Sequence, residues 1–115
     1  MKKLIILIIS IFILTACGIT YTTIDSNEAL SLIDNGAIII DVRTATEYNE
    51  GHIENAINIP IDNISEITYS KDEVIILYCA SGVRSSNAAK TLVDAGYTNI
   101  YNLDGGLINW GYGTE

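Results

Sequence analysis

A cysteine stands between a predicted strand and a predicted helix, on a short loop of small and polar residues. Residues 74–78 form an apolar, β-rich run, Cys79 follows directly, and an amphipathic helical pattern covers residues 86–95. A cysteine near a helix N-terminus meets unpaired N–H groups and the positive end of the helix dipole, which favour the thiolate. Arg84, five residues after Cys79, adds a permanent positive charge. This pattern predicts a nucleophilic cysteine in an anion-binding loop.

The loop itself is expected to bind the anion. Small side chains let the backbone turn its N–H groups inward around the sulfur, which would stabilise a thiolate and equally a persulfide anion. The predicted binding residues are Ala80, Ser81, Gly82, Val83, Arg84 and Ser85. The alternative is a buried structural cysteine at a strand end, and the combination of Gly82 with Arg84 disfavours it.

Three charged residues follow another predicted strand and are candidates for a supporting role. Asp41 ends that strand, Arg43 comes two residues later, and Glu47 four residues after Arg43. The carboxyl ends of parallel strands share one sheet edge, so these side chains should lie near Cys79. One interpretation is ion pairing and helix capping alone. The other is that Asp41 or Glu47 fixes Arg84 or the loop in place, since an anion site needs a rigid framework.

The single histidine, His52, invites a role as general base. The interpretation favoured here is that His52 orders the turn before the strand at residues 56–59, so it is not proposed as catalytic. With one histidine in the chain, no Cys/His metal cluster can be assembled, and no metal site is expected.

The first residues read as a targeting segment. Met1-Lys2-Lys3 is a positive start, an apolar stretch follows to Leu14, and small residues precede Cys17. Residues 1–16 resemble the signal peptide of bacterial lipoproteins, which implies cleavage before Cys17 and a lipid on its sulfur. Residues 17–21 would then be a lipidated tether that holds the domain at the extracytoplasmic face of a bacterial cell membrane. The alternative is an uncleaved anchor with Cys17 incidental.

Charge and cysteine usage limit the partners. The chain has 6 Lys+Arg and 14 Asp+Glu, and removing residues 1–16 takes away two lysines and no acid, which leaves a net charge of −10. That balance disfavours nucleic acids and anionic headgroups as partners.

If Cys17 is acylated, Cys79 is the one free thiol, and an intrachain disulfide is impossible. We expect a monomer without cofactors.

Strand and helix patterns alternate along the chain, which predicts an α/β fold with a mainly parallel sheet. Two possible N-caps, Asp25 and Thr44, each precede a glutamate by three residues. Leu30 and Ile33 are expected to face the core. The predicted strands are 22–24, 37–42, 56–59, 74–78 and 99–103; the predicted helices are 27–35, one from 44 to near 51, and 86–95, with short turns at 61–67 and 107–110.

At these residues the chain resembles the rhodanese family of sulfurtransferases. Residues 41–48 and 51–60 resemble the family's N-terminal signature, residues 79–85 its active-site loop, and Gly105-Gly106 with Trp110 its ending. The resemblance implies a domain at residues 22–113 with a five-stranded, mainly parallel sheet and helices on both faces. It also implies that Cys79 takes a sulfane sulfur from a donor such as thiosulfate. The persulfide would pass to a thiol or to cyanide.

Two other functions compete with this interpretation. In related cysteine phosphatases the arginine follows the cysteine by six residues, whereas here it follows by five. The shorter loop fits a persulfide better than a phosphoryl group, which disfavours a phosphatase or an arsenate reductase. The serious alternative is a tethered persulfide carrier or protein-interaction module with little turnover, because fold does not fix activity.

Overall fold

Five parallel strands form a single sheet in the order β1-β5-β4-β2-β3. The computed structural model describes residues 20–115, so Cys17 and the predicted signal peptide lie outside the described residues. The elements are β1 (Thr22–Ile24), α2 (Ser26–Asp34), β2 (Ile38–Asp41), α3 (Ala45–Glu50), β3 (Ile57–Asn58), η1 (Ile61–Glu66), β4 (Ile75–Tyr78), α4 (Val83–Asp94), β5 (Ile100–Leu103) and η2 (Gly106–Asn109). The predicted α/β class and five-stranded sheet are confirmed.

The centre of the sheet explains why the cysteine follows β4. All four residues of β4 are buried, as an apolar run covered on both faces requires. Its neighbour β2 pairs with it in a register that sets Asp41 beside Tyr78. The strands are parallel, so the residues after β4 and after β2 emerge at the same edge. Val42, directly before Arg43, therefore lies beside Cys79.

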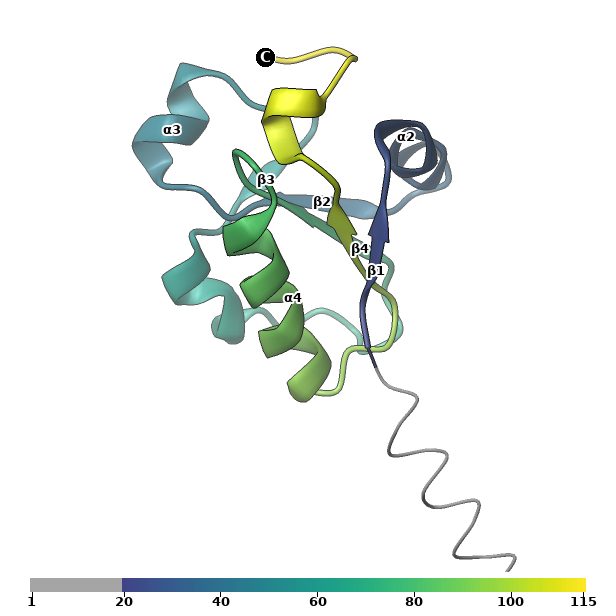
Figure 1. Ribbon diagram of the computed structural model, residues 1–115. Helices are drawn as coiled ribbons and strands as arrows, with labels where there is room; N and C mark the ends of the chain where they lie inside the picture. Colours follow the sequence, from purple (N-terminus) through teal and green to yellow (C-terminus); the bar gives the residue numbers. More distant parts are fainter. Residues whose placement is uncertain (1–19) are drawn as a thin grey trace, which may run out of the picture.

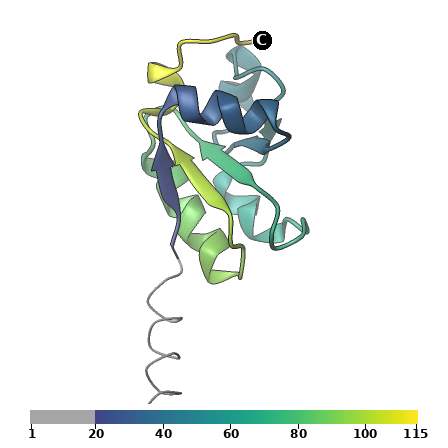
Figure 2. The same cartoon turned by 90° about the vertical axis from the view of Figure 1, so that its right-hand side faces the viewer.

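Helices cover both faces of the sheet, as Figures 1 and 2 show. On one face α4 and η1 pack against the strands through Ala88, Leu92 and Ile64. On the other face α2 supplies Ala29, with Tyr48 of α3 and Leu107 of η2 at the margin. Both helical layers are needed because each face of the parallel sheet is apolar and must be shielded from solvent.

Two of the predicted helix caps are observed, and the predicted start of a third helix is wrong. The Thr44 hydroxyl accepts from the N–H of Glu47, and the Glu47 carboxylate accepts in return, so this capping box is complete. The Asp25 carboxylate accepts from the N–H of Glu28. The last helix begins at Val83 instead of residue 86. Gly82 takes a left-handed φ of 104° there, which starts the helix three residues early.

Other predicted details also differ. Residues 56–59 are reduced to the two-residue β3, because β3 pairs with one neighbour only, at the sheet edge. The core-facing residues of α2 are Ala29, Leu32 and Ile33, spaced i, i+3 and i+4, while Leu30 lies beside this stripe. Within residues 20–115, no helix has the length and hydropathy that crossing a bilayer requires.

Candidate active site

The sulfur of Cys79 lies inside a ring of hydrogen-bond donors. The N–H of Gly82 donates to it at 3.1 Å, and the Ser85 hydroxyl lies 3.5 Å away. The Cys79 residue is buried, with 1% of its surface exposed. Ser81 is exposed, and its backbone N–H helps to lower the pKa of the Cys79 thiol. The loop is therefore a concave group of N–H donors around one sulfur atom.

The sulfur also replaces a missing cap at the start of α4. Gly82, the residue before the helix, has no side chain with which to accept from the first free N–H groups. The N–H of Ser85, the third residue of α4, is instead directed at the Cys79 sulfur and helps to lower the pKa of the thiol. In other helices, the side chain of a capping serine or aspartate accepts a hydrogen bond from the N–H at this position. The positive end of the helix dipole is thus aimed at the sulfur.

These contacts act on the ionisation of Cys79. Burial raises the pKa of the Cys79 thiol, whereas the hydrogen bond from the Ser85 hydroxyl lowers it. The backbone N–H groups of Ser85, Gly82 and Ser81 lower it further, and the resulting pKa lies below the usual value. A larger share of the thiol is therefore the reactive thiolate near neutral pH.

Replacing Ser85 with alanine should raise the pKa of the Cys79 thiol, because the thiolate loses a donor. The rate of alkylation by iodoacetamide, followed against pH, measures this pKa directly. Ser86→Ala is a matched control: the Ser86 hydroxyl contacts the Tyr21 hydroxyl at 3.1 Å, away from the sulfur. A rate profile with the same midpoint in both variants would refute the role given to Ser85.

Sequence reasoning missed one residue of the site, Asn102 of β5. Its side-chain oxygen accepts from the Ser85 hydroxyl at 2.6 Å, and its amide nitrogen donates to the Gly82 carbonyl at 3.4 Å. A hydroxyl has one proton, so the Ser85 hydroxyl can donate either to Asn102 or to the Cys79 sulfur at any moment. The bond to Asn102 keeps the Ser85 hydroxyl next to the sulfur. The sequence signal for Asn102 was a polar residue within a largely apolar predicted strand, because a polar side chain that is buried there needs a hydrogen-bond partner.

Arg84 does not extend freely over the loop. Its two terminal nitrogens bond both oxygens of Glu47, at 2.8 and 3.0 Å. Glu47 also accepts from the N–H of Thr44 at 3.1 Å, so one carboxylate joins the start of α3 to the first turn of α4. The guanidinium hydrogen bond from Arg84 is the main cause that lowers the pKa of Glu47 to about 2. Hydrogen bonding to Glu47 in turn raises the pKa of Arg84.

The Glu47 carboxylate should stabilise the fold in a pH-dependent way. Its pKa falls from 4.5 to about 2 on folding, so its contribution is complete above about pH 4.5 and is lost as the pH falls towards 2. The side chains of Arg84 and Glu47 are 38% and 32% exposed, which limits the contribution to roughly 1 kcal/mol or less. Urea unfolding of the wild type and of Glu47→Gln across this range should show the difference in stability shrinking with falling pH. A constant difference would contradict the prediction.

Asp41 and Arg43 form a buried ion pair at the end of β2. The Asp41 carboxylate, fully buried, accepts from the Nη2 of Arg43 at 2.7 Å and from the Tyr78 hydroxyl at 2.6 Å. Arg43 also donates to the Gly51 carbonyl at 2.7 Å. Burial, followed by the hydrogen bond to Asp41, raises the pKa of Tyr78, which keeps its hydroxyl protonated as a donor. Asp41 therefore supports the framework next to β4, while Glu47 is the carboxylate that contacts Arg84.

The turn at η2 fixes the outer side of the loop. The N–H of Leu107 donates to the Cys79 carbonyl at 2.9 Å, and that of Ile108 donates to the Ala80 carbonyl at 3.1 Å. With these carbonyls held outward, the following N–H groups are directed at the sulfur. Gly106 has a φ of 55°, and a side chain there would collide with the Cys79 carbonyl. The side chain of Val83, the first residue of α4, is exposed.

His52 orders a turn, as the sequence predicted. Its Nδ1 lies 2.9 Å from the Tyr48 carbonyl, and its ring stacks on that of Tyr48 at 3.7 Å between centroids. Its backbone forms two hydrogen bonds with Glu115. Among residues 20–115 no group of three metal-ligating side chains is close enough to hold an ion.

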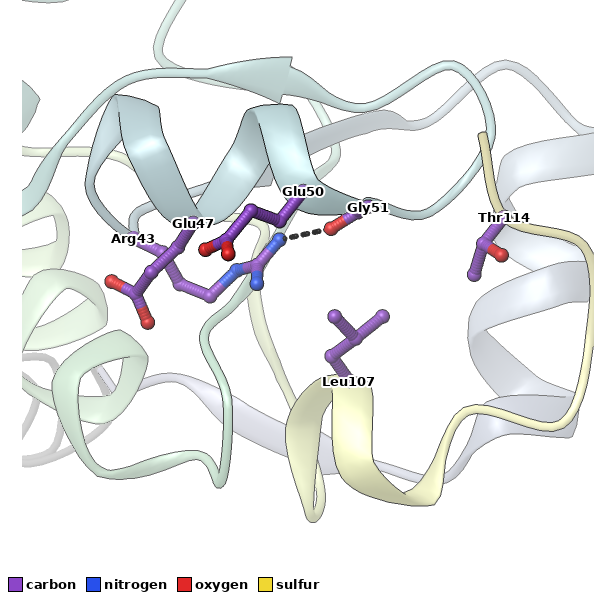
Figure 3. Close-up of a pocket in the computed structure, with 6 residues that line it drawn as sticks. All are labelled: Arg43, Glu47, Glu50, Gly51, Leu107 and Thr114. Carbon is purple, nitrogen blue, oxygen red and sulfur yellow. Dashed lines mark hydrogen bonds between the residues drawn. The ribbon is translucent and has the colours of Figure 1, made fainter.

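A cavity of about 420 Å³ lies next to this site (Figure 3). It opens between α3 and η2, close to the C-terminal segment. Its lining residues are Arg43, Glu47, Glu50, Gly51, Leu107 and Thr114. Glu47 and Leu107 each bond a residue of the cysteine loop, so the cavity and the loop share a wall.

The family model of the rhodanese-like domain matches residues 25–112. The chain belongs to this family. Rhodanese-like domain-containing protein 17 of Arabidopsis thaliana is 38% identical, over 76% of this chain and 67% of that protein. A rhodanese-related protein of Thermoplasma volcanium has a crystal structure that matches with a TM-score of 0.73 at 30% identity, covering 83% of this chain and 98% of that one.

Some rhodanese relatives are much longer. The tRNA uridine(34) hydroxylase of Erwinia tasmaniensis is 30% identical over 84% of this chain, and the matched part is 33% of that protein. The chain therefore spans about a third of the length of this relative. The likeness concerns the rhodanese-like part, and the activity of the whole hydroxylase does not transfer with it.

Proposed function

We propose that this rhodanese-like chain is a sulfurtransferase. Cys79 takes a sulfane sulfur from a small anionic donor, such as thiosulfate, and passes it as a persulfide to a thiol or to cyanide. The observation that carries the proposal is the Cys79 sulfur at the start of α4, bonded by the Gly82 N–H and the Ser85 hydroxyl, which help to lower its pKa. Such a site favours negative charge on sulfur both before and after the transfer. Membership of the rhodanese family supports the same chemistry.

In the first step the Cys79 thiolate attacks the outer sulfur of thiosulfate. A bond forms between the two sulfurs while the S–S bond within thiosulfate breaks. Sulfite leaves with that bonding electron pair, and Cys79 carries a persulfide. The N–H groups of Ser81 and Gly82 then face the negative charge of the new group. Arg84 has its charge offset by Glu47, so the backbone is the main source of stabilisation.

In the second step an acceptor nucleophile attacks the outer sulfur of the persulfide. The new bond joins that sulfur to the acceptor, the S–S bond to Cys79 breaks, and Cys79 leaves as the thiolate that started the cycle. Two half-reactions through one covalent intermediate predict ping-pong kinetics. Neither step calls for a metal or an organic cofactor.

The decisive experiment follows the sulfur on the purified full chain in neutral detergent. The intact mass is measured after thiosulfate treatment, and thiocyanate is measured after cyanide is added. The proposal expects a gain of one sulfur atom that cyanide removes. A protein whose Cys79 reacts with iodoacetamide but gains no sulfur would overturn it.

The alternative, a persulfide carrier with little turnover, is favoured by two observations. Cys79 is almost completely buried, which hinders the entry of a donor. Residues 20–115 also hold 4 basic and 14 acidic residues, and this charge repels dianions. Sulfur that loads but transfers slowly to excess cyanide would favour the carrier, whereas rapid repeated turnover would exclude it.

We further propose that the domain is anchored by a lipid on Cys17 at the extracytoplasmic face of a bacterial membrane. The basis is the sequence before Cys17. Mass spectrometry of the N-terminal peptide after bacterial expression should show cleavage before Cys17 and a diacylglycerol group on its sulfur. Cys17→Ser should abolish both. An unmodified Met1 peptide from the wild type would refute the anchor.

A further inference from the structure

The cavity beside the cysteine loop is large enough for a small molecule and is not used by the sulfur donor in the mechanism above. Its volume of about 420 Å³ falls in the range of ligand sites. In Figure 3 the side chains of Glu47 and Glu50 lie beside Arg43, across the cavity from Leu107. The wall thus combines charged groups of α3 with an apolar side chain of η2.

Most of the charge in this wall is already neutralised. The Arg43 guanidinium is paired with Asp41 at 2.7 Å, and Glu47 is paired with Arg84 at 2.8 Å. Glu50, which is exposed, forms no ion pair within 4.0 Å among residues 20–115. The cavity therefore offers one available carboxylate near an apolar surface, which suits a small cation with a short hydrocarbon chain.

The two lysines within residues 20–115 lie away from the cavity, so they do not offset the negative charge at this edge of the sheet. Lys71 precedes β4, at the opposite edge from Cys79, and its ammonium lies 4.1 Å from the Tyr97 ring centroid. Lys90 lies further along α4 and lines a different pocket with Asp94. Neither lysine is part of the wall around Glu50, so an anionic thiol would meet net repulsion there.

We propose that this cavity is the acceptor subsite and that its ligand is a small aminothiol. The inference rests on the proposed sulfurtransferase function. The ammonium group pairs with Glu50, the hydrocarbon chain contacts Leu107, and the thiol faces the loop. The acceptor thiol loses its proton to water, and its sulfur attacks the outer persulfide sulfur. The S–S bond to Cys79 breaks, Cys79 leaves as the thiolate, and the aminothiol carries the new persulfide, with no oxidant or reductant required.

Transfer rates to three thiols of similar size test the charge preference. The full chain is loaded with thiosulfate, desalted, and mixed with cysteamine, 2-mercaptoethanol or 3-mercaptopropionate, and rates are expressed per thiolate. Cysteamine should react about fivefold faster than 2-mercaptoethanol, as expected for one partly exposed ion pair, and 3-mercaptopropionate should be slowest. The differences should shrink at high salt. Equal rates for all three would overturn the subsite.

Glu50→Gln identifies the carboxylate responsible. It should remove the advantage of cysteamine and leave the rate with 2-mercaptoethanol unchanged. Asp62→Asn, which neutralises an exposed carboxylate of η1 outside the cavity, should keep the wild-type order. If Glu50→Gln keeps the cysteamine advantage, the assignment is wrong.

Binding to the unloaded protein separates this proposal from the proposed function. Titration with cysteamine, followed by ¹H–¹⁵N NMR, should shift the amide signals of Glu50, Gly51 and Leu107 in the wild type more than in Glu50→Gln. These shifts are expected even if thiosulfate never loads Cys79, which would refute the sulfurtransferase alone. Loading without such shifts would overturn the aminothiol subsite alone.

Discussion

Cys79→Ser should abolish sulfur loading completely while the domain stays folded. A serine hydroxyl is similar in size to the thiol, so it can still accept from the N–H of Gly82. It is not ionised near neutral pH, however, and it cannot form a persulfide. Intact mass after thiosulfate should show no added sulfur, and thiocyanate release should fall to the rate without protein.

The second cysteine of the chain provides the matched control. Cys17→Ser should load Cys79 as the wild type does, because Cys17 lies outside the matched rhodanese-like region. Circular dichroism should give the same spectrum for Cys79→Ser and the wild type. Sulfur that loads and reacts with cyanide in Cys79→Ser would require a different nucleophile and would refute the mechanism.

Asp41→Ala should cause the largest loss of stability of any change near the site. Asp41 is fully buried and balances the charge of Arg43, which is 5% exposed. Removing it leaves the buried guanidinium without its counter-ion and the Tyr78 hydroxyl without its acceptor. Breaking a buried ion pair in this way costs about 3–5 kcal/mol. Urea unfolding monitored by circular dichroism measures the loss.

Two further variants keep this prediction testable if Asp41→Ala does not fold. Asp41→Asn retains the shape of the side chain and one acceptor oxygen, so its free energy of unfolding should lie between those of the wild type and Asp41→Ala. Asp62→Asn removes an exposed carboxylate and should change stability by less than about 0.5 kcal/mol. If Asp41→Asn is as stable as the wild type, the carboxylate charge contributes nothing to the buried pair.

The elements were predictable where local signals and burial agreed. The apolar run before Cys79 gave the central strand β4, and Thr44 with Glu47 gave the start of α3. The start of α4 was predicted too late, because a glycine cap depends on a left-handed backbone angle and leaves no side-chain signal. The site residue most easily missed was Asn102, because its role depends on β5 lying beside β4.

The partners of the charged residues were the least predictable part of the site. Sequence order placed Asp41, Glu47 and Arg84 near one edge but left open which carboxylate meets the arginine. The choice is made by tertiary geometry. Asp41 is turned inward to Arg43, and the first turn of α3 brings Glu47 to Arg84 across 37 residues of sequence.

The sulfur of Cys79 takes the place of a side-chain cap, so the reacting atom and the helix end cannot be altered independently. Thermodynamic linkage makes this relation reciprocal: if the end of α4 favours charge on the sulfur, charge on the sulfur stabilises the end of α4 by the same free energy. Alkylation or oxidation of the thiol is therefore also a perturbation of the fold. In this domain, the ionisation of one sulfur atom and the stability of one helix are linked equilibria.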